Sequence, residues 1–178
     1  MLTRNLLTLS PEPLITESYW RISMNILSQC YLFKGLVEPQ LLRLAKITKE
    51  IQIRKGQFFM REGQQAEELF VLKEGAVELL TKVEDGFELP IAIFRNPGDC
   101  IGTSALVEPY IYSLNSRCVK DSKILVINKT ALKELMQGDH ELGCTIMRNL
   151  AQHLLNRLKE TRQELKVHFK TIFRSTQL

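Results

Sequence analysis

The sequence predicts a mainly β fold, an antiparallel sandwich or barrel with helices at both ends. Between residues 50 and 128, short runs of alternating apolar residues are separated by glycine-bearing turns at intervals of about 7–12 residues. This stretch has no room for the helical crossovers that a parallel sheet needs. The segments on either side instead carry apolar residues at helical spacing.

Residues 1–30 are expected to form an N-terminal tail followed by an extra helix. Two prolines interrupt the first 14 residues, which we interpret as the tail. Apolar residues between Ser18 and Cys30 suit an amphipathic helix. A second helix is expected to open at Glu38-Pro39-Gln40, because proline is well tolerated in a first helical turn.

The barrel domain is expected to span residues 31–137. Its strands should alternate with tight turns, and glycine supplies the positive φ that such turns require. The candidate strands are Ile51–Ile53, Gln57–Met60, Leu69–Leu72, Ala76–Leu80, Leu89–Phe94, Leu114–Val119 and Ile124–Ile127. Asn128 should then cap a short helix that runs from Lys129 to Met136.

Residues 138–178 are expected to form a long C-terminal helix with Asp139 as its N-cap. Its apolar positions alternate in spacing between four and three, which is typical of a coiled-coil seam. The seam comprises Met147, Ala151, Leu154, Leu158, Thr161, Leu165, His168 and Ile172, and a second apolar row holds Leu150, Leu155, Phe169 and Phe173. A small barrel cannot cover so long a face, so we expect a homodimer; the alternative is a helix packed only on its own barrel.

Composition excludes several classes of protein. The chain has 178 residues, 44% of them hydrophobic and 25% charged, and a net charge of +4. This is the composition of a globular protein, and the charge surplus is too small to indicate a dedicated nucleic-acid binder. Neither a membrane span nor a signal peptide is predicted, which leads us to expect a cytoplasmic protein.

The four cysteines are scattered, without the close pairs of a metal site, and are expected to be buried free thiols: Cys30, Cys100, Cys118 and Cys144.

An ordered set of motifs resembles the cyclic-nucleotide-binding domain family, and more narrowly the sensor domain of catabolite-activator and fumarate–nitrate-regulator (CRP/FNR) type proteins. The motifs lie between about residues 30 and 170: Gly56 after Ile53-Arg54-Lys55, Gly63 after Arg61-Glu62, Leu69 to Val77, Pro97-Gly98-Asp99-Cys100-Ile101-Gly102, and Leu150-Ala151 with Arg157-Leu158. The resemblance implies an antiparallel jelly-roll barrel with a ligand pocket and a dimerising C-terminal helix.

The resemblance also implies a phosphate cassette in which a Glu binds the ribose and an Arg neutralises the cyclic phosphate. The corresponding residues are Gly102, Thr103, Ser104 and Ala105, with Tyr112 at the Arg position and Ser113 after it. Thr103 carries no charge, and no cation stands at the Arg position. Because a charge-assisted hydrogen bond contributes about 1.5–3 kcal/mol, tight binding of cAMP or cGMP is not expected.

Three readings of nearby residues stay open at this stage. Thr103 and Ser104 are expected to act as an N-cap, with a weak anion or neutral-ligand site as the alternative. Arg117 is expected to be a solvated strand residue that could instead lean into the pocket. Thr161 and Arg162 occupy positions from which family members reach the base, although Thr161 also suits the seam.

The sequence therefore predicts a non-enzymatic regulatory domain. A cupin-type metal site needs histidines in the barrel, and His140, His153 and His168 all lie in or near the last helix. No cofactor is predicted, neither metal nor haem, although an unidentified small ligand or a protein partner could occupy the pocket. Direct DNA binding is not expected, since the sequence ends where a helix-turn-helix domain would begin. The alternatives are a fragment of a CRP/FNR-type transcription regulator and a true cyclic-nucleotide regulator with a non-standard pocket.

Overall fold

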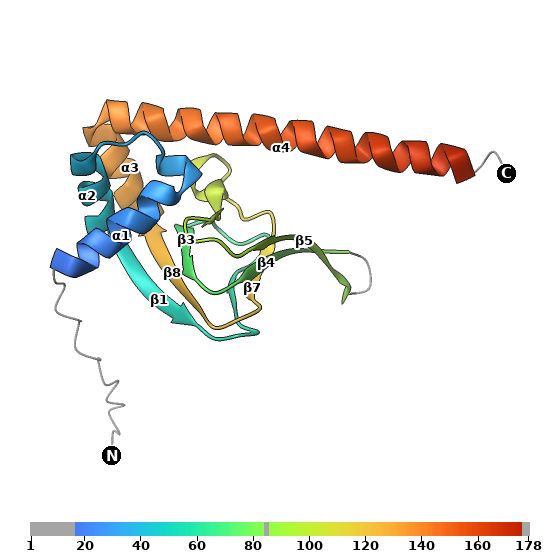
Figure 1. The fold of residues 1–178 in the computed structure, drawn as a ribbon, viewed down its shortest axis with the longest axis horizontal. Helices are drawn as coiled ribbons and strands as arrows, with labels where there is room; N and C mark the ends of the chain where they lie inside the picture. The colour runs from blue at the N-terminus through green and yellow to red at the C-terminus, as the bar shows by residue number, and fades with distance from the viewer. Residues whose placement is uncertain (1–16, 84–85, 176–178) are drawn as a thin grey trace, which may run out of the picture.

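The computed structural model describes residues 17–83 and 86–175 and has two four-stranded antiparallel sheets with helices at one end (Figure 1). The expected tail falls on residues outside this description. The helix α1 spans Glu17–Gln29, the single turn η1 spans Tyr31–Phe33, and α2 spans Glu38–Lys46. Both predicted N-terminal helices are present, and α2 begins at Glu38 as expected.

The two sheets form the jelly-roll barrel. One sheet has the strand order β1-β8-β3-β6 and the other has the order β2-β7-β4-β5. The strands are β1 (Thr48–Ile53), β2 (Phe58–Met60), β3 (Glu68–Glu74), β4 (Val77–Lys82), β5 (Glu88–Phe94), β6 (Cys100–Ile101), β7 (Asn115–Cys118) and β8 (Ser122–Asn128). The predicted mainly β fold is confirmed, and β6 is an additional strand of two residues.

Strand β3 is buried on both faces, which explains its unbroken apolar run. Phe70 and Leu72 point into the core between the two sheets, here called the barrel core. Leu69 and Val71 point to the other side and join the helical core, which α1, η1, α2, α3 and α4 share with them. Successive strand residues face opposite sides of a sheet, so one strand supplies both cores.

The helical core joins segments that are far apart in the sequence. Leu27 from α1, Leu44 from α2 and Leu132 from α3 are buried together, and so are Leu142 and Leu150 from α4. The helix α3 spans Lys129–Gly138 and α4 spans His140–Ser175. Leu150, from the second apolar row of α4, is 2% exposed in this core, because the first part of α4 packs on the other helices.

The start of α4 is fixed by Asp139, as predicted. Its Oδ1 accepts a hydrogen bond from the Leu142 backbone N–H at 2.9 Å, and its Oδ2 accepts hydrogen bonds from Gln40 and Arg43 on α2. The bond from the Leu142 amide is the main reason why the pKa of Asp139 is lowered. Asn128 caps α3 in the same manner, accepting from the Thr130 and Ala131 amides. One carboxylate thus caps α4 and ties it to α2.

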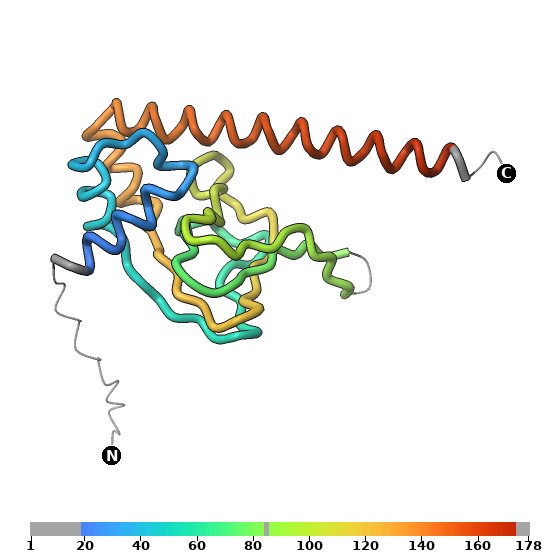
Figure 2. The backbone as a smooth tube through the Cα atoms, viewed as in Figure 1, coloured from blue at the N-terminus to red at the C-terminus, as the bar shows by residue number. Residues whose placement is uncertain are grey.

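Most of α4 extends past the barrel, as the red part of the tube in Figure 2 shows. The helix has 36 residues, so it is about 54 Å long. Its predicted seam is exposed in this single chain: Met147, Ala151, Leu154, Leu158, Leu165 and Ile172.

Cys144 is also exposed, contrary to expectation, whereas Cys30, Cys100 and Cys118 are buried as predicted. Within the described residues, no helix combines the length and apolar character needed to cross a bilayer.

Candidate ligand site in the barrel

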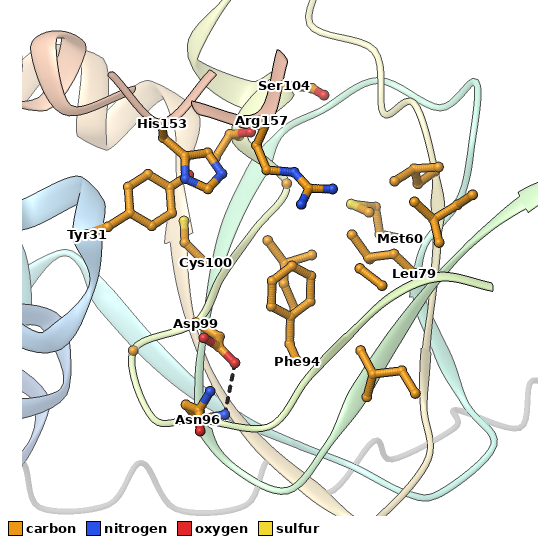
Figure 3. Close-up of a pocket in the computed structure, with 18 of the residues that line it drawn as sticks. Tyr31, Met60, Leu79, Phe94, Asn96, Asp99, Cys100, Ser104, His153 and Arg157 are labelled. Carbon is orange, nitrogen blue, oxygen red and sulfur yellow. Dashed lines mark hydrogen bonds between the residues drawn. The ribbon is translucent and has the colours of Figure 1, made fainter. Parts of the chain in front are cut away.

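A cavity of about 780 Å³ lies between the barrel and α4. Its floor and walls come from β2, β4, β5, β6 and η3 (Thr103–Leu106), and its outer side comes from η1 and α4 (Figure 3). The apolar part of its wall includes Met60, Leu79, Ile91, Ile93, Phe94, Leu114 and Leu154. Its polar part includes Thr103, Ser104, Ser113, Asp99, His153 and Arg157.

Gly102 turns the chain from β6 into η3. Its φ is +81°, a left-handed conformation that residues with a Cβ rarely adopt. A Cβ at this position would also lie 3.2 Å from the Glu68 carbonyl oxygen and 3.3 Å from the Tyr112 ring. The N-cap position of η3 is therefore Gly102, which has no side chain, and the prediction that Thr103 and Ser104 cap this turn is wrong. Both hydroxyl residues instead line the cavity.

Tyr112 lies behind the cassette, outside the residues that line the cavity. Its side chain is 6% exposed in the barrel core, and its hydroxyl donates to the Glu68 carbonyl at 2.8 Å and accepts from the Glu68 amide at 3.1 Å. Burial raises the pKa of this phenol. Both hydrogen-bonding functions of the hydroxyl are thus satisfied by β3, and Tyr112 is a structural residue of the barrel rather than a group that faces a ligand.

The other predicted site residues lie in three places. Gly102, Thr103, Ser104 and Ser113 come together at one end of the cavity. Ala105 is 2% exposed and points into the barrel core. Thr161 and Arg162 are exposed on α4 beyond the cavity and do not line it, because α4 continues straight past the barrel.

Arg157 lines the cavity but was not among the site residues predicted from the sequence. Among the described residues that line the cavity, Arg157 is the only arginine or lysine. Figure 3 shows its guanidinium reaching from α4 toward the middle of the cavity, between His153 and Met60. Its Nη1 also pairs with Glu160 Oε2 at 3.0 Å, and both side chains are about half exposed. The Arg position of the cassette holds no cation, as predicted, and the arginine of the cavity lining comes from α4 instead.

Arg117 does not supply a second cation. Its Nε donates to Glu78 Oε1 at 2.6 Å, its Nη1 lies 3.8 Å from Glu88 Oε2, and its guanidinium lies 5.7 Å from the centre of the Phe58 ring. These contacts hold it among β2, β4, β5 and β7, outside the cavity lining. Arg117 is thus an ion-paired residue of the sheet, neither freely solvated nor turned inward.

An aromatic pair closes the cavity between η1 and α4. The Tyr31 and His153 rings stack with their centroids 4.0 Å apart and an interplanar angle of 15°. Asn149, one helical turn earlier, donates its side-chain amide to the Leu32 and Lys34 carbonyls at 3.0 and 2.8 Å. Burial, and secondarily the charge of Arg157, lowers the pKa of His153. The cavity wall is therefore attached to α4 at the point where that helix leaves the barrel.

The buried Cys100 thiol lies below this aromatic pair and lines the cavity (Figure 3). Cys30 is fully buried at the end of α1 and belongs to the same helical core as Cys100. In the part of the chain that the structure describes, no three His, Cys, Asp or Glu residues are grouped as a metal site would require.

Comparisons with known proteins agree with this architecture. The family model described as "Cyclic nucleotide-binding domain" matches residues 50–139, which is half of the chain. The chain belongs to the cyclic nucleotide-binding domain family. This confirms the predicted resemblance, and the matched region contains the cavity floor and the Gly102 turn but not Arg157, which lies beyond it on α4.

The relatives include regulators. The chain is 31% identical over 150 residues to the anaerobic regulatory protein of Bacillus subtilis (strain 168). The aligned region covers 83% of this chain and 62% of that protein. It thus spans about three-fifths of the length of this relative. Among solved structures, a putative cyclic nucleotide-binding protein from Geobacter metallireducens is 30% identical with a TM-score of 0.65, covering 76% of this chain and 98% of that one. The Thermus thermophilus catabolite activator protein, 24% identical, shares the fold with a TM-score of 0.66, covering 77% and 62%.

Proposed function

We propose that this chain is a non-enzymatic sensor domain whose barrel cavity takes a small anionic ligand through Arg157, without binding cAMP or cGMP tightly. The observation that carries this proposal is the position of Arg157, which is the one arginine or lysine among the described residues that line this largely apolar cavity. A guanidinium that faces an apolar wall favours an anionic partner, which would compete with Glu160 for Arg157. The ligand, of unidentified structure, would combine one anionic group with an apolar body that fits the walls.

The cassette end of the cavity supports the exclusion of tight cyclic-nucleotide binding. In the family a Glu follows the cassette glycine, and here Thr103 stands in that place next to Gly102. Asp99 is the one carboxylate among the described lining residues, and its Oδ2 already accepts hydrogen bonds from the Arg95 and Asn96 amides at 2.9 and 2.8 Å. A ribose hydroxyl bound at this end of the cavity would therefore lack the carboxylate that accepts its hydrogen bond in the family.

We further propose that the domain acts as a homodimer through the seam of α4. Leu154 belongs both to the seam and to the cavity wall, so a ligand in the cavity would touch the same helix that pairs the two copies. The alternative to a second copy of this chain is a different protein that covers the seam of α4. Such an arrangement would let a ligand shift the balance between two packings of the long helices.

The second candidate is a true cyclic-nucleotide regulator with a non-standard pocket, alone or as part of a longer transcription regulator. Arg157 is the specific observation that favours it, because a cyclic phosphate carries one negative charge and would find its counter-charge on α4 instead of in the cassette. The two candidates differ only in the affinity for cAMP and cGMP, which calorimetry measures directly.

The experiment compares the wild type with Arg157→Met and with Lys159→Met, a matched loss of charge on α4 outside the cavity lining. We expect calorimetry to show no binding of cAMP or cGMP with a sub-micromolar Kd for any of the three proteins. Native mass spectrometry of the purified wild type should detect a bound anion that Arg157→Met loses and Lys159→Met keeps. A sub-micromolar nucleotide affinity that falls about 10- to 100-fold in Arg157→Met alone would establish the second candidate. A sub-micromolar nucleotide affinity that is unchanged in Arg157→Met would overturn both candidates.

A further inference from the structure

A second groove lies where α3 meets α4, outside the ligand cavity, and is here called the corner groove. It has a volume of about 610 Å³ and is lined by α3, by the first two turns of α4 and by residues of the segment from Ala105 to Tyr110. Small-molecule sites in proteins typically enclose about 300–1,000 Å³. Among the described residues, none lines both the corner groove and the cavity that Arg157 enters.

The apolar side of the corner groove depends on close packing of the two helices. A Cβ on Gly143 would lie 3.0 Å from the Met136 carbonyl oxygen and 3.2 Å from the Met136 Cβ, so the backbone of α4 approaches α3 closely at this glycine. Met136, Met147 and Leu106 line the groove around this point. Methionine side chains are flexible and polarizable, and they adapt to apolar partners of different shapes.

The charged side of the corner groove is cationic. Lys129 and Lys133 line it from successive turns of α3, and no carboxylate is found among the described lining residues. The Lys129 ammonium is already engaged, because it pairs with Glu67 Oε1 at 2.7 Å and lies 4.8 Å from the centre of the Tyr110 ring. Lys133 is exposed, and within the described part of the chain it forms no ion pair. The groove therefore offers one ammonium group that is available to an anion.

The corner groove and the ligand cavity lie on two sides of the same turn. Thr103 and Ser104 of η3 line the cavity, whereas Ala105 and Leu106 of η3 line the groove. The groove also borders the seam of α4 through Met147. A molecule in the groove would thus contact both the turn that bounds the cavity and the helix that leaves the barrel.

We propose that the corner groove binds a small amphipathic carboxylate, with the carboxylate on Lys133 and the apolar part against Met136 and Met147. The charge balance favours a monoanion, because Glu67 neutralises Lys129 and Lys133 alone remains to be compensated. The apolar lining favours a hydrocarbon chain or a small ring, whose burial removes apolar surface from water on both partners. Because the groove and the cavity share no lining residue, this inference does not rest on the function proposed for the cavity.

Cys144 provides a direct readout of this groove. It lines the groove and is exposed, whereas Cys30, Cys100 and Cys118 are buried. The test measures the rate at which iodoacetamide alkylates Cys144 in the native full chain, by peptide mass spectrometry, with octanoate or octan-1-ol as the probe. The two probes have the same apolar chain and differ in the carboxylate. We expect octanoate to slow the alkylation at lower concentrations than octan-1-ol.

Three variants separate recognition of the carboxylate from other effects. Lys133→Met keeps the methylene stem and loses the exposed ammonium, so it should weaken the protection by octanoate about 2- to 5-fold. Lys159→Met and Arg157→Met should be protected like the wild type, since neither residue lines the corner groove. Circular dichroism should show that all three variants are folded.

Several outcomes would overturn the proposal. Octanoate that gives no protection, equal protection by octan-1-ol, or an unchanged effect in Lys133→Met would mean that the groove does not recognise the carboxylate. Protection that is lost in Arg157→Met would assign octanoate to the cavity instead. Protection that appears only in a monomeric Leu158→Lys variant would show that a second copy of the chain covers the groove.

Discussion

The Tyr31 ring lies flat against the His153 imidazole, with ring centroids 4.0 Å apart, and this contact joins the first turn after α1 to the part of α4 that leaves the barrel. Cys100 lies below it and Arg157 lies one helical turn beyond it, so the contact borders both the cavity and the buried Cys100 thiol. The features that a sensor would use are thus concentrated at one junction between the barrel and the long helix.

The stacked histidine should make stability depend on pH. Burial holds the pKa of His153 below its usual 6.5, so the folded state prefers the neutral ring. Its contribution is therefore fully present above about pH 6.5 and declines as the pH falls from there toward the folded-state pKa. We expect thermal melts to show a smaller loss of Tm over this window for His153→Phe, which keeps the stacked ring without its titration. His140→Gln, at an exposed position of the same helix outside the seam, should follow the wild type. Equal pH profiles for all three proteins would contradict the prediction.

Charge placed on the seam should disrupt the proposed dimer. Leu158 and Val167 are both apolar and about half exposed, but only Leu158 occupies a seam position. A lysine in a coiled-coil core position loses apolar burial and introduces repulsion between the two copies. We expect sedimentation to give a dimer for the wild type and for Val167→Lys, and a monomer or a much weaker dimer for Leu158→Lys. A monomeric wild type would remove the homodimer from the proposal.

The close contact between Gly98 and α1 should make that glycine irreplaceable. Gly98 has φ +90° and Gly63 has φ +82°, so alanine at either position adopts a strained conformation that costs about 1–2 kcal/mol. Only at Gly98 would the new Cβ meet backbone atoms, at 2.9 Å, whereas at Gly63 it meets nothing within 4 Å. We therefore expect urea unfolding to show a clearly larger loss of stability for Gly98→Ala than for Gly63→Ala.

A structural role for Tyr112 predicts that its hydroxyl matters for folding and not for ligands. Tyr112→Phe leaves the Glu68 carbonyl and amide without their side-chain partner, at a cost of about 1–3 kcal/mol in the free energy of unfolding. Tyr110→Phe, which keeps the ring under Lys129, should cost much less. If Tyr112→Phe abolished the binding of a copurifying ligand without lowering stability, the hydroxyl would belong to the site after all.

Much of the fold was predictable because it rests on local patterns. Asn128 and Asp139 stand where a helix must satisfy its first amides, and Gly102 stands where a strand must turn sharply into a helix. Such requirements are met by residues a few positions apart, so the chain displays them in order. The burial of Leu150 in the helical core could not be predicted in this way, because a helical repeat does not reveal which part of a long helix is covered by other helices.

The sequence by itself determined the class of this protein: the antiparallel barrel, the capped helices, the long apolar seam and the uncharged Thr103 after the cassette glycine. Only the tertiary structure decided which side chains share the cavity. Arg157 enters it from α4, and Tyr112 turns away to bond with β3. The physical reason is that a cavity is formed by elements distant in the chain, and no local periodicity or turn preference records which of them will face one another.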